Sequence, residues 1–196
     1  MRSRTGEVRR TTRETDVCVE VRLDGTGEAR VRTGLGFFDH MLELLARHAA
    51  IDLVVAAEGD LEVDEHHTVE DVGLAMGEAL DRALGERHGI RRYGFWVPMD
   101  EALAHVVLDL SGRSFVVFEA EFARERVGEL PTELVEDFVR ALADRLRATI
   151  HVDVVRGRND HHRIEALFKA LGRALRAAVE TDERFADRVP STKGVL

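Results

Sequence analysis

Apolar residues between positions 66 and 80 recur at the spacing of an amphipathic helix. Val69, Val72, Met76 and Leu80 fall on one face when the period is 3.6 residues. Residues 161–175 have the same spacing, and shorter stretches at 37–45 and 134–142 share it. The pattern predicts four helices, each with one face directed to a core.

Other segments alternate apolar and polar residues or are rich in β-branched side chains, as is typical of strands. We expect strands at residues 16–23, 29–33, 51–56, 105–110, 114–122 and 149–155. A few strands followed by a helix, a strand and a helix then occur twice along the chain. This order predicts an α+β fold in which each half is a small β-sheet packed against two helices.

The two longest expected helices begin with the same motif. Residues 66–80 and 161–175 are identical at seven of 15 aligned positions, and both open with His-His-x-x-Glu. A shared bias in composition would not place this motif identically in both segments. We therefore predict an internal duplication, with half-domains at residues 1–90 and 91–196.

The composition narrows the class of protein. The chain has 196 residues, of which 44% are hydrophobic and 33% charged, as in soluble globular proteins. The net charge of −9 argues against a general affinity for nucleic acid or anionic membranes. No apolar run approaches the roughly 20 residues that span a bilayer. The first residues are polar, and Cys18 is the single cysteine. We expect a cytoplasmic protein with neither a nucleic-acid nor a membrane partner.

The repeated motif has the residue types of a metal site. Residues four apart share a helix face, whereas adjacent residues point about 100° apart. His66 and Glu70 can therefore hold one metal ion while His67 faces another, and residues 161–165 repeat this arrangement. Imidazole and carboxylate ligands without thiolates suit Mn, Fe or Zn. Two solvated, acidic helix starts are the alternative, but they would not explain four histidines.

Two further residues could complete these sites. His40 lies near the start of the expected helix at 37–45, and its counterpart in the second half is Asp137. Either could add a ligand to one of the two sites. For Asp137 the alternative is an exposed acid at a helix start.

Three short basic segments could bind an anion. They are Arg91–Arg92, Ser111–Arg113 and Ser191–Gly194, which combine positive charge with hydroxyl or backbone N–H donors. Such groups suit a phosphate, to which arginine donates forked hydrogen bonds. The chain has no Walker A or dinucleotide-binding glycine pattern, which argues against a nucleotide.

Together these motifs resemble the imidazoleglycerol-phosphate dehydratase family. The resemblance is carried by residues 36–42, 64–71, 109–113, 159–170 and 191–196, and it extends from Arg10 to the C-terminus. No additional phosphatase domain is present, as in the monofunctional form. The resemblance implies a lyase of histidine biosynthesis that converts imidazole glycerol phosphate to imidazole acetol phosphate. It also implies two Mn²⁺ ions per active site, a metal-stabilised imidazolate and a homo-oligomer of 24 subunits with active sites at the interfaces.

The resemblance also implies roles for individual residues. One metal ion would bind His40, His67, His161 and Glu165. The other would bind His66, Glu70, His162 and the residue at position 137, where the family usually has histidine and this chain has Asp137. Asp137 could bind directly, bind through water or leave the position to water. The expected substrate contacts are Glu14, Arg92, Arg113, Lys169, Ser191, Thr192 and Lys193. The expected catalytic residues are the ligands His40, His67, Glu70, His161 and Glu165 together with Glu14, which competes with metal-bound water as the acid or base.

Two other functions are compatible with the residues alone. A di-metal hydrolase or phosphatase that acts on a small phosphorylated substrate would use metal ions about 3.5–4 Å apart. A metal-storage shell would need the histidine motifs but not the basic segments.

Overall fold

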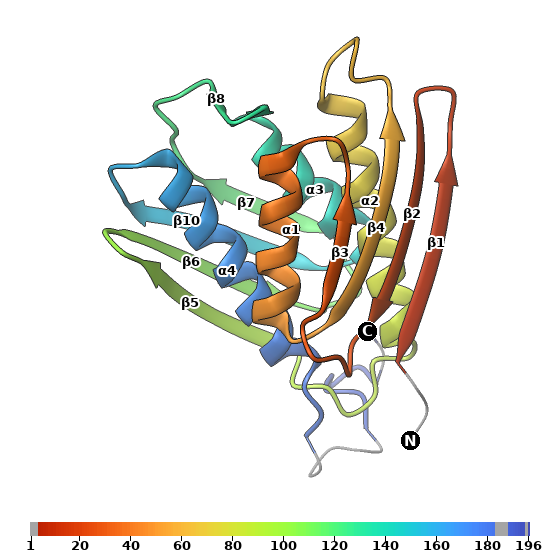
Figure 1. Ribbon diagram of the computed structural model, residues 1–196. Helices are drawn as coiled ribbons and strands as arrows, with labels where there is room; N and C mark the ends of the chain where they lie inside the picture. The colour runs from red at the N-terminus through yellow and green to blue at the C-terminus, as the bar shows by residue number, and fades with distance from the viewer. Residues whose placement is uncertain (1–3, 183–187, 195) are drawn as a thin grey trace.

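The computed structural model describes residues 4–182, 188–194 and 196, and its helices lie between two β-sheets (Figure 1). The first half contains β1 (Thr5–Thr11), β2 (Thr15–Arg22), β3 (Ala29–Arg32), α1 (Gly36–Ala49), β4 (Asp52–Gly59) and α2 (His66–Leu84). The second half contains β5 (Tyr93–Met99), β6 (Ala102–Asp109), β7 (Phe115–Glu119), β8 (Arg126–Val127), β9 (Leu130–Pro131), α3 (Leu134–Leu146), β10 (Thr149–Arg156) and α4 (Asp160–Val179).

The strand order confirms the predicted α+β fold and its duplication. One sheet has the order β1-β2-β4-β3 and the other the order β5-β6-β10-β7. In the first sheet β3 is parallel to β4, and in the second sheet β7 is parallel to β10. All other neighbouring pairs in the two sheets are antiparallel. The small β8–β9 hairpin occurs only in the second half among the described residues. The half-domain boundary expected between residues 90 and 91 stays a prediction; it falls in the segment between α2 and β5.

The helices from the two halves form one central layer. α2 lies across β1 and β2 and packs against α3, whereas α4 lies across β5 and β6 and packs against α1. Each helix pair therefore takes one member from each half. The buried apolar residues form a single core between the two sheets, so neither half could bury its helices alone.

Glycine permits the closest approach at both helix crossings. A Cβ atom at Gly77 of α2 would lie 2.4 Å from the carbonyl oxygen of Leu142 on α3. A Cβ atom at Gly172 of α4 would lie 2.6 Å from the carbonyl oxygen of Leu45 on α1. Gly77 and Gly172 occupy the same position in the two repeats. Both crossings therefore use the same contact between a glycine and a backbone carbonyl.

Four strands have no counterpart among the sequence predictions. They are β1, β5, β8 and β9. In β1 only Gly6 and Val8 are buried and the outward residues are polar or charged, so the segment lacks an apolar signal. The strand expected at 114–122 ends at Glu119. Within the described part of the chain, no helix has the length and apolar character needed to cross a bilayer.

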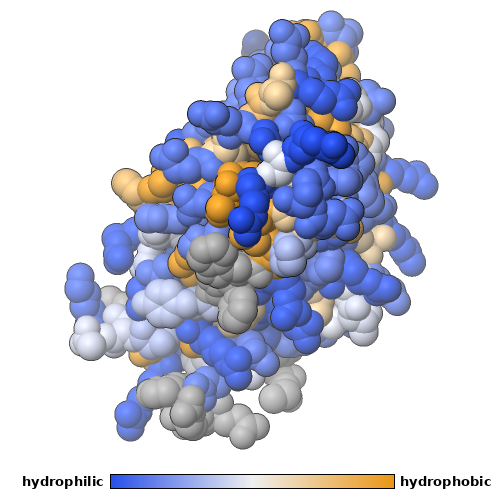
Figure 2. Space-filling model, turned by 90° about the vertical axis from the view of Figure 1, so that its left-hand side faces the viewer, coloured by the Kyte–Doolittle hydropathy of each residue, from blue (hydrophilic) through white to orange (hydrophobic). Residues whose placement is uncertain are grey.

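The outer faces of the two sheets differ in polarity. Figure 2 views the side of the sheet formed by β5, β6, β10 and β7, where hydrophobic side chains gather near the centre among polar ones. Tyr93, Val107, Phe115 and Val155 are exposed on this sheet. On the outer face of the first sheet, charged residues such as Glu7, Arg9 and Glu20 are exposed, and Val54 is its one large apolar residue at a described exposed position.

Candidate metal centre and anion cavity

The four helices begin at the same end of the molecule, which is the upper end in Figure 1. Both His-His motifs lie in the first turn of their helix and have equivalent caps. The Asp64 carboxylate accepts a hydrogen bond of 2.8 Å from the backbone N–H of His66. The Asn159 side chain accepts one of 2.9 Å from that of His161. These caps favour helix initiation at the motif and place both histidine pairs at this end.

The clearest ligand cluster combines α1 and α4. Ligand atoms of His40, His161 and Glu165 all lie within 4.8 Å of one another, and His161 Nε2 is 3.4 Å from Glu165 Oε2. Two imidazoles and a carboxylate at these separations fit a divalent cation such as Mn²⁺, Fe²⁺ or Zn²⁺. His40 comes from a different half of the chain, so the central helix layer creates this cluster.

Glu165 occupies an unusual position for a carboxylate. Its relative exposure is 8%, and Lys169 Nζ lies 2.6 Å from its Oε1. Burial by itself would raise the pKa of Glu165, but the hydrogen bond and charge of Lys169, with His161 and His40, lower the pKa below its usual value. The group is therefore an anion at neutral pH, as a metal ligand must be.

The second set of expected ligands lies at α2 and α3 and is more widely spaced than the first, since the ligand atoms of His66, Glu70 and Asp137 do not all lie within 4.8 Å of one another. His66 Nδ1 is 3.6 Å from Asp137 Oδ2, so the structure places the departure from the family pattern beside the expected ligand. Glu70 is exposed one turn after His66 on the same helix. His66, Glu70 and Asp137 are the pseudo-equivalents of His161, Glu165 and His40, respectively.

The remaining two histidines have other partners. His67 Nδ1 lies 3.1 and 3.2 Å from the two carboxylate oxygens of Asp60, and its Nε2 is 3.8 Å from Glu14. His162 Nδ1 lies 2.8 Å from Glu101 Oε2. Among the described residues, the ligand cluster around His40 contains neither of them. The helix-face argument, in which adjacent histidines serve different sites, agrees with this arrangement.

The carboxylates also shift the pKa values of these two histidines. The hydrogen bond to Asp60 raises the pKa of His67. The hydrogen bond to Glu101 raises the pKa of His162, and the same bond, with backbone N–H groups, lowers the pKa of Glu101 to about 2. Both carboxylates were absent from the sequence predictions. Glu101 could have been noticed because it occupies, before β6, the position that Glu14 occupies before β2.

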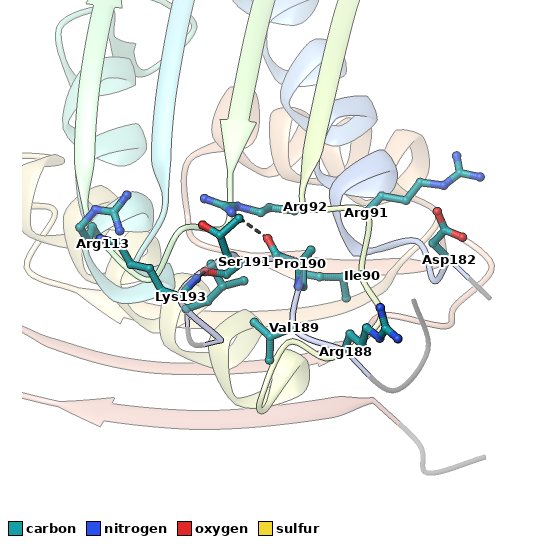
Figure 3. A pocket seen from close by; sticks show the side chains of 12 residues that line it. Ile90, Arg91, Arg92, Arg113, Asp182, Arg188, Val189, Pro190, Ser191 and Lys193 are labelled. Atoms are coloured by element: carbon teal, nitrogen blue, oxygen red, sulfur yellow. Dashed lines mark hydrogen bonds between the residues drawn. The ribbon is translucent and has the colours of Figure 1, made fainter. Parts of the chain in front are cut away.

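A basic cavity of about 870 Å³ lies at the other end of the molecule (Figure 3). Its walls contain five predicted substrate contacts, namely Arg92, Arg113, Ser191, Thr192 and Lys193. Two other predicted contacts, Lys169 and Glu14, lie instead with the histidines. Arg188 also lines the cavity, and its isolated position in the sequence gave no signal. Val195 of the terminal motif lies outside the described residues.

The cations of the cavity differ in how they are paired. Arg92 donates to both carboxylate oxygens of Asp109 and, at 2.9 Å, to the carbonyl oxygen of Pro190. Arg91 pairs with Glu180 at 2.8 Å. Within the described part of the chain, Arg113, Arg188 and Lys193 have no carboxylate partner at ion-pair distance. These three are therefore the cations most available to an incoming anion.

The chain is similar to known proteins over nearly its whole length. A family model described as imidazoleglycerol-phosphate dehydratase matches residues 33–175. The enzyme of that name from Halorhodospira halophila is 58% identical over 197 residues, covering 100% of both chains. The one from Cereibacter sphaeroides is 56% identical over 194 residues, covering 98% of this chain and 100% of the relative.

Solved structures lead to the same family. The crystal structure of imidazoleglycerol-phosphate dehydratase from Staphylococcus aureus has a TM-score of 0.82 and 39% identity, and the match covers 91% of this chain and 99% of that chain. The structure from Pyrococcus furiosus has a TM-score of 0.83 and 39% identity, covering 96% of this chain and 100% of that chain. From its full-length relatives and its fold, the chain belongs to the imidazoleglycerol-phosphate dehydratase family, the hydro-lyases of histidine biosynthesis.

Proposed function

We propose that this chain catalyses the manganese-dependent dehydration of imidazole glycerol phosphate, in active sites assembled from different subunits of a cytoplasmic homo-oligomer. Two Mn²⁺ ions would serve each active site. The observation that carries the proposal is the separation, within one chain, of the histidine clusters from the basic cavity.

That separation is larger than the substrate. α4 has 20 residues and is roughly 30 Å long, with His161 in its first turn. The basic cavity lies beyond its other end, where the backbone N–H groups of Arg91 and Arg92 donate to the carbonyl oxygens of Glu180 and Ala178. An imidazole joined to a three-carbon phosphate cannot extend over this distance. A substrate that contacts both regions must therefore lie between two copies of the chain.

The histidines support the same assembly. The cluster of His40, His161 and Glu165 has three ligands, and His67 of another subunit would be the fourth. The cluster of His66, Glu70 and Asp137 would be completed by His162 of another subunit. We propose an assembly of 24 subunits, as the resemblance to the family implies.

The residues divide the chemistry between them. The bound metal ions would stabilise negative charge on the imidazole ring and so favour loss of the C3 hydroxyl group. Arg113 and Lys193 would hold the phosphate and fix the position of the glycerol chain. Glu14 lies in the β1–β2 turn with its carboxylate near His67 Nε2, and it would move the proton at C2 or protonate the departing hydroxyl. None of the relatives above is named as a hydrolase, so we do not propose the di-metal hydrolase.

Mixed oligomers test the shared active site. His161→Ala and Arg113→Ala should each abolish or greatly reduce formation of imidazole acetol phosphate. If a site takes its metal ligands and its phosphate contacts from different subunits, co-assembly of the two variants restores some intact sites and measurable activity. Mixtures as inactive as the separate variants would contradict the proposal.

Metal removal tests the ligand sets independently. If metal ions join ligands from different subunits, a chelator should reduce the size of the oligomer, and Mn²⁺ should restore both the size and the activity. The size can be followed by light scattering. An oligomer of unchanged size after complete removal of metal would exclude metal ions as part of the subunit contacts.

A further inference from the structure

His67 and His162 are each held by a carboxylate through the same ring nitrogen. Asp60 contacts His67 Nδ1 at 3.1 Å, and Glu101 contacts His162 Nδ1 at 2.8 Å. An ionised carboxylate can only accept a hydrogen bond, so Nδ1 is the donor in both cases. The lone pair of each histidine is then on Nε2, which is the atom left for a metal ion.

The two carboxylates come from different positions of the repeat. β2 and β6 both have eight residues, so Glu14, directly before β2, is the counterpart of Glu101, directly before β6. β4 and β10 are also equivalent, but β10 has a bulge between Val154 and Arg156, so Gly157 corresponds to Gly59 and Arg158 corresponds to Asp60. In the first half, the carboxylate that contacts the histidine is therefore Asp60 at the end of β4. In the second half it is Glu101, in the turn of the β5–β6 hairpin.

The second half has no acid at the position of Asp60. A Cβ atom at Gly157 would meet Arg163 and one at Gly59 would meet Thr68, the third residue of each His-His motif, so these glycines occupy the same place in the two halves. The next residue is Asp60 in the first half and Arg158 in the second. In the second half Glu101 contacts the histidine instead. It also accepts hydrogen bonds from the backbone N–H groups of Arg158 at 3.2 Å and Asn159 at 3.0 Å.

In the first half, Glu14 does not contact Nδ1 of the histidine, as its counterpart Glu101 does in the second half. Its side chain is 54% exposed, and its nearest contact with His67 is at Nε2 and not at Nδ1. Glu14 therefore lies on the side of His67 where metal and substrate would bind. Glu101 has three partners and is on the opposite, Nδ1 side of its histidine.

From this geometry we propose that the paired hairpin glutamates have divided roles: Asp60 and Glu101 are positioning residues that hold His67 and His162 in the form that binds metal through Nε2, and Glu14 alone is available for proton transfer. The inference rests on the proposed function, because it takes both histidines to be metal ligands.

Amide variants separate these roles. The side-chain amide of Asp60→Asn or Glu101→Gln can donate to Nδ1, which moves the ring proton to Nε2 and blocks the ligand atom while the shape is kept. We expect each variant to weaken Mn²⁺ binding by about 10–100-fold, the usual effect of losing a ligand's supporting carboxylate. Thermal unfolding of the metal-free protein should change little. Glu14→Gln should bind Mn²⁺ as the unaltered protein does, yet have a much lower kcat.

Cobalt provides a readout that is independent of activity. In Co²⁺-loaded protein, the visible absorption should change in Asp60→Asn and Glu101→Gln, because a histidine ligand is lost, but not in Glu14→Gln. Glu62→Gln, an exposed carboxylate in the same loop as Asp60, is the matched control and should alter neither property.

The outcomes distinguish this inference from the proposed function. Normal Mn²⁺ affinity and an unchanged cobalt spectrum in both Asp60→Asn and Glu101→Gln would overturn the positioning roles. Weakened Mn²⁺ binding in Glu14→Gln would overturn the division between the two glutamates. If the unaltered protein bound no Mn²⁺ or formed no imidazole acetol phosphate, the proposed function itself would fail.

Discussion

The two half-domains have the same strand order and the same helix crossings, but their surfaces have different side chains. Gly77 and Gly172 meet the opposite helix in the same way, and Asp64 and Asn159 cap the two histidine motifs alike. In contrast, the exposed positions of the first sheet are mostly charged, whereas the second sheet exposes several large apolar side chains. Only the second half contributes the residues of the basic cavity other than Ile90.

This difference shows which parts of a duplicated fold are constrained. The helix crossings allow no extra atom, so both copies need glycine there. The helix starts must both supply ligands if each metal site draws on both repeats. The sheet faces and the chain ends have neither constraint, and there the halves differ. The candidate ligands follow the first pattern, but Glu165 is buried beside Lys169 whereas Glu70 is exposed.

The largest effect should come from replacing the two repeated glutamates. We expect Glu70→Gln and Glu165→Gln each to lower kcat/KM about 100-fold or more, at least as much as loss of a ligand's support. Glu165→Gln should also reduce the stability of the metal-free protein by about 1–3 kcal/mol, because Lys169 loses its anionic partner in a mostly buried position. Kinetics and denaturant unfolding measure the two effects. Full activity of Glu70→Gln would mean that the halves are not equivalent in function.

The basic cavity should matter almost as much. Arg113→Ala and Lys193→Ala should each weaken substrate binding by about 1.5–3 kcal/mol, the scale of a charge-assisted hydrogen bond. Steady-state kinetics should show this as a decrease in kcat/KM. Arg30→Ala, an exposed arginine on β3 of the first half, serves as the control and should have little effect. Unchanged kinetic constants in both cavity variants would exclude this phosphate site.

The two helix crossings should respond equally to a single methyl group. Overpacking typically costs about 1–3 kcal/mol, and alanine returns at most about 1 kcal/mol through its helix propensity. Overpacking should prevail because the nearest atoms are backbone carbonyl oxygens. We expect Gly77→Ala and Gly172→Ala each to lower the free energy of unfolding by about 1–2 kcal/mol, whereas Arg173→Ala, at an exposed neighbouring position, should not. Very different losses at the two glycines would show that the crossings are not equivalent.

Asp137 tests whether the departure from the family pattern matters. We expect Asp137→His to keep activity, because it restores the usual ligand, and Asp137→Ala to weaken Mn²⁺ binding about 10-fold. Isothermal titration of metal-stripped protein measures the affinity. An Asp137→Ala variant with the original Mn²⁺ affinity would show that this site has only three protein ligands, namely His66 and Glu70 of one subunit and a histidine of another.

The smallest expected effect is the pH dependence of the stability that Asp52, the first residue of β4, contributes. Asp52 begins β4, and backbone N–H groups of Thr26 and Glu28, with Arg22, lower its pKa from 3.8 to about 2. A lowered pKa stabilises the fold above pH 4, and this contribution is lost as the pH falls from about 4 to 2. The difference in melting temperature between the unaltered protein and Asp52→Asn should therefore disappear over that range.

Thr149 provides the control for this prediction because it begins β10, the counterpart of β4. Its hydroxyl does not titrate, so the effect of Thr149→Val on the melting temperature should not change between pH 4 and pH 2. A pH-independent effect of Asp52→Asn would contradict the role of its carboxylate charge.

Much of the local structure was predictable from the sequence. The spacing of Val69, Val72 and Met76 predicted α2, and the repeated His-His-x-x-Glu predicted both the duplication and the different directions of adjacent histidines. These features depend on helix periodicity, which involves only neighbouring residues. The strand β1 was missed because its inward face has only Gly6 and Val8, and what makes it a strand is pairing with β2.

The grouping of distant residues was decided by the tertiary structure. The resemblance to the family placed Glu14, Lys169, Arg113 and Lys193 together as substrate contacts, whereas within one chain the first two lie with the histidines and the last two at the opposite end. Likewise, the sequence predictions did not identify Asp60 and Glu101 as partners of His67 and His162. A helix fixes the direction of its own side chains, but the distance between residues on different elements depends on how helices and sheets pack. The sequence by itself therefore determined the types of the candidate ligands and the helix faces on which they lie, and the packing decided which of them meet.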